Sequence, residues 1–124
     1  MILEHDKKRF PERVDFIQMP GYLWGKESRT TVGLKPKTGP YAVVTTLGLF
    51  HFDEQGEMVL MAYHPSTSVQ EVKKNVQLDL TVSKKVKPLE PPNEEELNVL
   101  RNQIDPQGMY LRNARSLKGR KLSV

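Results

Sequence analysis

The sequence predicts a single α/β domain, and three features of the chain lead to that prediction. Residues 39–50 are twelve uncharged residues that open with Gly-Pro and are rich in β-branched side chains, as is typical of a buried strand. Residues 57–63 form a second apolar run, separated from the first by the turn-forming residues 53–56. Helix-start signals follow at Ser68 and Asn93.

The strands are expected to pair through hairpins rather than through regular βαβ units. The two apolar runs predict a β-hairpin over residues 41–63, and residues 14–17 form a short candidate strand before it. Residues 78–82 alternate apolar and polar side chains, as a half-buried strand does, and the prolines of residues 84–92 predict an extended connector. Residues 20–40 are rich in Gly and Pro, and so long a connection is often either functional or an arm that packs on the domain.

Two helices are predicted from their N-terminal signals. Ser68 and Glu71 form a capping-box pattern, which predicts a helix over residues 69–77. Asn93 is followed by three glutamates, which the helix dipole favours in a first turn. The second helix is therefore predicted over residues 93–104.

The charge of the chain is concentrated at its C-terminus. The net charge is +4, yet the last thirteen residues hold five basic and no acidic side chains, and the remainder has 14 basic against 15 acidic. Residues 1–111 are therefore predicted to form the domain, and residues 112–124 a disordered basic tail. Binding of anions or nucleic acid through this tail is the lowest-ranked alternative, because no aromatic side chain is interleaved with the charges.

Composition also limits the compartment and the chemistry. The chain contains no Cys, which excludes disulfides and thiolate chemistry. No apolar run reaches the roughly 20 residues that a membrane span needs, and the N-terminus lacks a signal-peptide layout. We expect a cytoplasmic protein without a membrane partner.

No catalytic or metal-binding residue is predicted. The three histidines, His5, His51 and His64, lie far apart in the sequence and are expected to be ordinary surface residues. Glu27 is the one acidic residue considered as a catalytic candidate, because it lies in the Gly-rich connection. No Gly-rich nucleotide loop or nucleophile elbow is present.

One loop offers a candidate anion site. Lys35 and Lys37 lie between Gly33 and Gly39, and they are candidates for contacting an anion such as a nucleotide phosphate. A solvated turn is the alternative interpretation of the same loop.

A set of short segments, in order and with consistent spacing, resembles the C-terminal half of class I CoA-transferase β subunits, in particular those of the glutaconate CoA-transferase type. The resemblance extends over residues 10–110, about four-fifths of the chain. The matching segments are residues 8–10, 14–17, 20–21, 39–50, 56–58, 64–65, 69–72, 75–79, 90–97 and 104–110.

The resemblance implies an open α/β sheet of the CoA-transferase type, coenzyme A as the family substrate, and a partner. That partner is an α-like subunit or the N-terminal half of the β subunit, with a homo-oligomer as a further option. In this family a glutamate in a Glu-Asn-Gly motif attacks an acyl-CoA, and the coenzyme moves to a carboxylate. The chain contains no Glu-Asn-Gly, so no catalytic residue is carried over and the chain is predicted to be inactive alone.

Three points remain open at the level of the sequence. Relatives of this type read Gly-Leu-Pro-Gly-Gly-Gly-Pro where residues 33–40 read Gly-Leu-Lys-Pro-Lys-Thr-Gly-Pro, which removes glycines from a loop near substrate. A branch of the fold works as a ring-opening hydrolase instead of a transferase. The chain is either a fragment or split-gene product of a β subunit, or a stand-alone interaction domain without chemistry.

Overall fold

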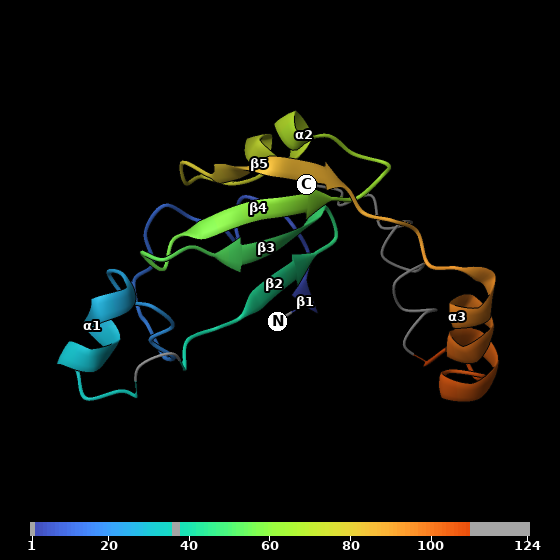
Figure 1. The fold of residues 1–124 in the computed structure, drawn as a ribbon, viewed down its shortest axis with the longest axis horizontal. Helices are drawn as coiled ribbons and strands as arrows, with labels where there is room; N and C mark the ends of the chain where they lie inside the picture. The colour runs from blue at the N-terminus through green and yellow to red at the C-terminus, as the bar shows by residue number, and fades with distance from the viewer. Residues whose placement is uncertain (1, 36–37, 110–124) are drawn as a thin grey trace, which may run out of the picture. The chain divides into compact units, whose positions relative to one another are not determined.

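The computed structural model describes residues 2–35 and 38–109 of the chain (Figure 1). Two compact units are distinguished, Met1–Glu90 and Pro91–Val124, and each is described by itself. The predicted division between residues 111 and 112 lies outside the described residues and stays a prediction. No helix among the described residues is long and apolar enough to cross a membrane.

The first unit is built on a mixed, open five-stranded sheet, which confirms the predicted α/β fold class (Figure 1). The order in the sheet follows the order in the chain, with antiparallel β2–β3 and β3–β4 pairs and parallel pairs at both sides. The strands are β1 (Ile2–Leu3), β2 (Ala42–Thr45), β3 (Gly48–Phe52), β4 (Met58–Tyr63) and β5 (Thr81–Pro88).

The predicted hairpin over residues 41–63 is a three-stranded meander, because its first uncharged run folds back on itself. The Thr45 hydroxyl accepts the backbone N–H groups of Leu47 and Gly48, at 3.2 and 3.0 Å, and so closes a tight turn. A Cβ on Gly48 would lie 2.9 Å from the carbonyl oxygen of Ala62, so this position needs glycine. One predicted strand is therefore two, while the turn between β3 and β4 lies where the sequence predicts it.

The connection from β4 to β5 corrects the expectation that strands pair only through hairpins. Helix α2 (Val69–Lys74) joins β4 to a parallel β5, which is a βαβ unit. The Ser68 hydroxyl accepts the N–H of Glu71 at 3.2 Å, as expected, although the helix ends at Lys74 instead of residue 77. Strand β5 begins at residue 81, so most of the predicted connector belongs to the sheet.

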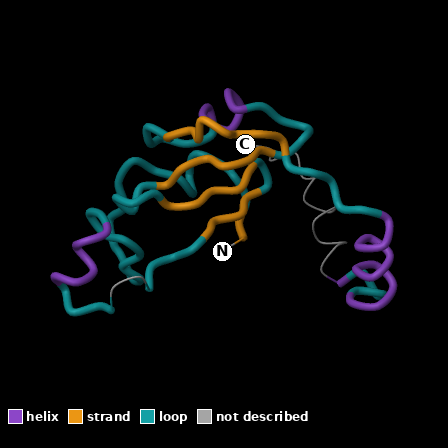
Figure 2. Tube along the Cα trace, viewed as in Figure 1, coloured by secondary structure: helices purple, strands orange, loops and turns teal. Residues whose placement is uncertain are grey.

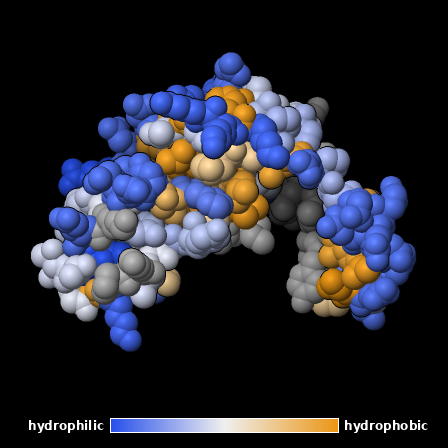
Figure 3. Space-filling model, in the orientation of Figure 1, coloured by the Kyte–Doolittle hydropathy of each residue, from blue (hydrophilic) through white to orange (hydrophobic). Residues whose placement is uncertain are grey.

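The core of the first unit lies between α2 and the sheet. Phe50, Leu60, Val72 and Leu80 are its fully buried side chains, and Phe10 packs against them. Figure 3 shows apolar residues over the middle of one face, bordered by hydrophilic ones.

The candidate strand over residues 14–17 is not formed. This segment is irregular, with a bend at Asp15, and its apolar side chains are exposed, Phe16 by 81%. It has no neighbouring strand among the described residues, so it lacks the ladder that would make it a strand.

A long arm, residues 19–40, precedes β2 and contains helix α1 (Lys26–Thr31) (Figure 2). The Tyr22 ring of this arm packs against the sheet, at Phe52 of β3. It lies 5.1 Å from the Phe52 ring, between centroids, and a Cβ on either Gly39 or Gly56 would overlap it. Two of the chain's glycines therefore leave room for one aromatic ring.

The second unit contains helix α3 (Glu94–Val99), which continues as the π-helical turn η1 (Leu100–Ile104). Asn93 and Glu96 form a complete capping box, in which each side chain accepts the backbone N–H of the other residue at 2.8 Å. The predicted helix over residues 93–104 is thus present, with a different final turn.

Candidate functional site

A cavity of about 830 Å³ lies between the arm and β2. Its walls are mostly apolar side chains and backbone, and among the described residues Arg29 is the one charged side chain that lines it. The lining residues are Met19, Pro20, Gly21, Arg29, Leu34, Thr38, Gly39, Pro40, Tyr41, Ala42 and Val43.

Arg29, in helix α1, is 9% exposed and is held by neutral oxygens of the arm. Its Nη1 donates to the Gly21 carbonyl, and its Nη2 donates to the Thr38 carbonyl and hydroxyl at 3.3 and 2.9 Å. The Thr38 hydroxyl in turn donates to the Lys35 carbonyl at 2.7 Å. These contacts fix the guanidinium between the two ends of the arm.

The charge of Arg29 has no counter-charge among the described residues. All 15 acidic side chains of the protein lie within the described part of the chain, at positions 4–105. The ion pairs there join other residues: Arg9 to Glu4 and to Asp6, and Lys87 to Glu90. The Nε of Arg29 is buried and has no hydrogen-bond partner among these residues. Burying a cation without a counter-charge and with an unsatisfied N–H group costs folding free energy. Arg29 is therefore a candidate functional residue.

His5 corrects the expectation of three surface histidines, because its side chain is only 7% exposed. Its ring lies between Phe10 and Phe50, with centroids 4.9 and 5.7 Å away. Nε2 lies 3.0 Å from the Val72 carbonyl, which can only accept, so Nε2 carries the hydrogen; Nδ1 lies 3.1 Å from the Thr45 hydroxyl. Burial lowers the pKa of His5, and the Val72 carbonyl and the Asp6 charge oppose that shift only in part.

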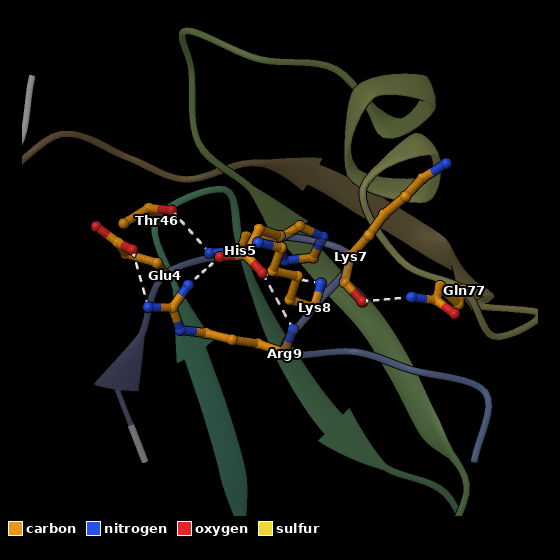
Figure 4. Close-up of polar contacts among 8 residues, drawn as sticks. Glu4, His5, Lys7, Lys8, Arg9, Thr46 and Gln77 are labelled. Atoms are coloured by element: carbon orange, nitrogen blue, oxygen red, sulfur yellow. Dashed lines mark hydrogen bonds and ion pairs between the residues drawn. The ribbon is translucent and has the colours of Figure 1, made fainter. Parts of the chain in front are cut away.

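His5 therefore ties the start of the chain to α2 and β2, and its surroundings serve the same purpose (Figure 4). Its backbone N–H donates to the Thr46 hydroxyl at 3.1 Å, and Gln77 Nε2 donates to the Lys7 carbonyl at 2.8 Å. Asp6 accepts the N–H groups of Lys8 and Arg9 in an exposed turn. This is an anchoring arrangement, since the imidazole is buried and both of its ring nitrogens have hydrogen-bond partners.

The other predicted candidates are not brought together. His51 is half-buried beside the Tyr41 ring, 5.0 Å between centroids, and His64 is exposed and bonded to Ser66. Glu27 is exposed in the first turn of α1.

Of the two candidate anion-loop lysines, Lys35 is exposed and does not line the cavity, and Lys37 lies outside the described residues. In the described ranges, no three His, Cys, Asp or Glu side chains lie close enough to hold a metal ion.

Sequence analysis missed Arg29, and no local pattern marks it. It stands in an ordinary polar helix, and its burial depends on contacts with Gly21 and Thr38, eight and nine residues away. The Gly- and Pro-rich composition of the arm was the one signal in the sequence, and it pointed to the segment and not to the residue.

No protein-family model matches the chain. The chain is 38% identical, over 107 residues, to the β-type subunit of glutaconate CoA-transferase from Acidaminococcus fermentans, a match that covers 86% of this chain and 40% of the relative. The crystal structure of glutaconate coenzyme A-transferase from the same organism superposes with a TM-score of 0.82 and 34% identity, over 89% of this chain and 42% of that chain.

Two further solved structures share the fold at lower identity. IpdAB from Rhodococcus jostii RHA1 matches with a TM-score of 0.70 and 22% identity, over 90% of this chain and 44% of that chain. The decarboxylase AibA/AibB matches with a TM-score of 0.57 and 21% identity, over 91% of this chain and 40% of that chain. The chain spans about two-fifths of the length of the proteins it matches. The resemblance to CoA-transferase β subunits is thus confirmed: in sequence and in structure, the chain is similar to part of the β-type subunit of glutaconate CoA-transferase.

Proposed function

We propose that this chain is the scaffold portion of a CoA-transferase β-type subunit that works in the cytoplasm. The observation that supports this most directly is its 38% identity to the glutaconate CoA-transferase β-type subunit across 86% of the chain. In this proposal the complete assembly moves coenzyme A between an acyl-CoA and a free carboxylate. An α-like subunit, or polypeptide equivalent to the remainder of a β subunit, completes that assembly.

The chain alone is proposed to lack transferase activity. The family resemblance places the glutamate nucleophile in a Glu-Asn-Gly motif, and the chain contains no such tripeptide. Without that nucleophile neither the acyl-anhydride nor the glutamyl-CoA thioester can form. The contribution of this chain is instead the rigid sheet against which the catalytic part is held.

A hybrid subunit tests the scaffold role. In it, the residues of this chain replace the 107 aligned residues of the Acidaminococcus β-type subunit, and the hybrid is assembled with its natural partner. We expect transfer of coenzyme A from acetyl-CoA to glutaconate, lost when the glutamate of the Glu-Asn-Gly motif becomes Gln. A folded, assembled hybrid without transfer contradicts the proposal.

The isolated chain provides the complementary measurement. Purified chain with acetyl-CoA and glutaconate is expected to give no transfer above the rate without protein. Turnover that disappears in a variant of one of its own carboxylates, such as Glu27→Gln, would show that the chain carries its own nucleophile.

A second candidate function is a non-catalytic interaction domain of the same fold. The exposed apolar side chains of the first unit favour it: Met19, Trp24 and Tyr41 are exposed by 84%, 83% and 81%. Apolar surface of this kind is typical of protein interfaces. The molar mass in solution tests for a partner surface, because a strict monomer in the presence of an α-like chain argues against one. Transfer of coenzyme A by the hybrid subunit then favours the scaffold role over a non-catalytic domain.

A further inference from the structure

We propose that residues 2–9 form a latch that packs on β2 and α2, and that His5 releases it when its imidazole takes up a proton. The segment contains β1 and the turn after it, and Phe10, which belongs to the core, marks its end (Figure 4). The latch depends only on contacts within the first unit and is independent of the proposed function.

The first argument is the direction of the hydrogen bonds around the His5 ring. The Thr45 hydroxyl has two lone pairs and one hydrogen, and its lone pairs accept the N–H groups of Leu47 and Gly48. Its hydrogen is therefore donated, either to Nδ1 at 3.1 Å or to the Gly48 carbonyl at 3.2 Å. The ring fits these contacts in its neutral form, with the hydrogen on Nε2 directed at the Val72 carbonyl.

A proton on Nδ1 makes that contact unfavourable. Both ring nitrogens of an imidazolium are donors, so the Nδ1 hydrogen meets a Thr45 oxygen whose lone pairs are already taken. The charged ring also lies between Phe10 and Phe50, where it has lost most of its contact with water. The closed latch therefore binds a proton less readily than the open latch does.

The charges around His5 do not compensate for its burial. On its own segment Asp6 favours the proton, yet Asp6 and Glu4 are both paired with Arg9. Strands β2 and β3 present an uncharged hydroxyl and a phenyl ring to the imidazole. Helix α2 presents a backbone carbonyl, and its charged side chains are exposed: Glu71, Lys73 and Lys74. Burial consequently lowers the pKa of His5 in the closed latch.

The second argument is that the latch can leave the sheet without unfolding it. Strand β1 has two residues and lies at the edge of the sheet, where β2 is its one neighbour among the described strands. The Thr46 hydroxyl accepts the His5 N–H at 3.1 Å, and the Thr46 N–H donates to the Leu3 carbonyl at 3.2 Å. Gln77 adds one exposed bond to the Lys7 carbonyl, at 2.8 Å. Opening breaks these few contacts and keeps the ladders between β2 and β5.

Opening also frees the edge of β2. In the closed latch Ile2 pairs with Val44 and Leu3 with Thr45, in parallel orientation. A strand edge without a neighbour can pair with a strand of another polypeptide. The latch therefore makes pairing at this edge depend on pH.

Amide hydrogen exchange of the intact chain, followed by NMR between pH 5 and 8, tests the latch. The reporters are the backbone amides of His5 and Thr46, and the amides of the β3–β4 pair are the reference. After correction for intrinsic exchange rates, protection of the reporters should fall by up to about tenfold per pH unit below pH 6.5, because opening takes up one proton. The reference amides should remain more strongly protected than the reporters at every pH.

Two variants assign the effect to His5. His5→Gln should remove the pH dependence of the reporters, because glutamine offers a donor and an acceptor but does not titrate. His64→Gln, which removes an exposed histidine of the same unit, should leave it unchanged. In the wild type, the ring resonances of His5 should shift over the same pH range in which protection falls, a measurement that stands even if His5→Gln does not fold.

Reporter protection that is constant between pH 5 and 8 overturns the latch, as does an equal loss in the wild type and in folded His5→Gln. Reporters that exchange together with the reference amides at every pH also overturn it, because the segment then opens only when the whole unit unfolds.

Discussion

At the residue scale, the two buried basic side chains of the first unit, His5 and Arg29, serve different ends. His5 is neutral, stacked between Phe10 and Phe50, and both of its ring nitrogens have partners. Arg29 carries a permanent charge, and its Nε has no partner among the described residues. His5 can be buried because an imidazole can release its proton and become neutral. An arginine side chain cannot become neutral in this way.

Stability should depend on pH through His5. Because burial lowers its pKa below 6.5, the unfolded chain binds a proton more readily than the folded chain does. The stabilising contribution of neutral His5 is therefore complete above pH 6.5. As the pH drops below 6.5, the free energy of unfolding falls by at most about 1.4 kcal/mol per pH unit. Urea unfolding between pH 5 and 8 measures this.

His5→Gln should remove that pH dependence and also cost about 1–3 kcal/mol at pH 8, because the stacked ring and one buried hydrogen bond are lost. His64→Gln is the matched control, since His64 is exposed. If the wild type and His5→Gln lose stability in parallel below pH 6.5, another group is responsible.

At the element scale, α2 is short and depends on its N-cap. It has six residues, and Ser68 provides its one side-chain cap, through the N–H of Glu71. Ser68→Ala should lower the free energy of unfolding by about 1 kcal/mol, whereas Ser68→Asn should retain most of it, because Asn caps as well as Ser. Urea unfolding of both variants checks this; equal losses would mean that the cap is not what stabilises α2.

The same elements show which parts of the fold the sequence can predict. Both caps and the turn between β3 and β4 depend on residues within four positions of each other, and they lie where predicted. The division of residues 41–52 into β2 and β3 was missed, because the Thr45 turn is as uncharged as the strands beside it. The position of β5 depends on parallel pairing with β4, a contact that no local pattern encodes.

The candidate site likewise depends on contacts between residues that are distant in the sequence, which no local pattern predicts. The arm is recognisable from its Gly and Pro content, but the burial of Arg29 arises only when Gly21 and Thr38 close around it. Lys35 was one of the two anion-loop candidates in the sequence, yet its side chain is exposed and its carbonyl accepts from the Thr38 hydroxyl. Charge alone locates neither residue; the three-dimensional contacts of the arm do.

At the scale of the whole molecule, the chain has a well-packed core and an apolar arm surface at the same time. The core residues Phe50, Leu60 and Val72 are fully buried, whereas Trp24 is exposed by 83% and Met19 by 84%. The chain matches only 40% of its Acidaminococcus relative, so most of that protein has no counterpart here. We interpret the arm surface as one that another polypeptide covers.

This interpretation predicts concentration-dependent association of the purified chain, through the arm, when no other partner is present. Burying an indole at an interface contributes roughly 1.5–3 kcal/mol, so Trp24→Ser should weaken association by about tenfold or more. Gln18→Ser, an exposed polar change just before the arm, should leave it unchanged. Sedimentation velocity over a range of concentrations measures both variants against the wild type. A wild type that stays monomeric at all concentrations, or a Trp24→Ser chain that associates like the wild type, would show that the arm is not the contact surface.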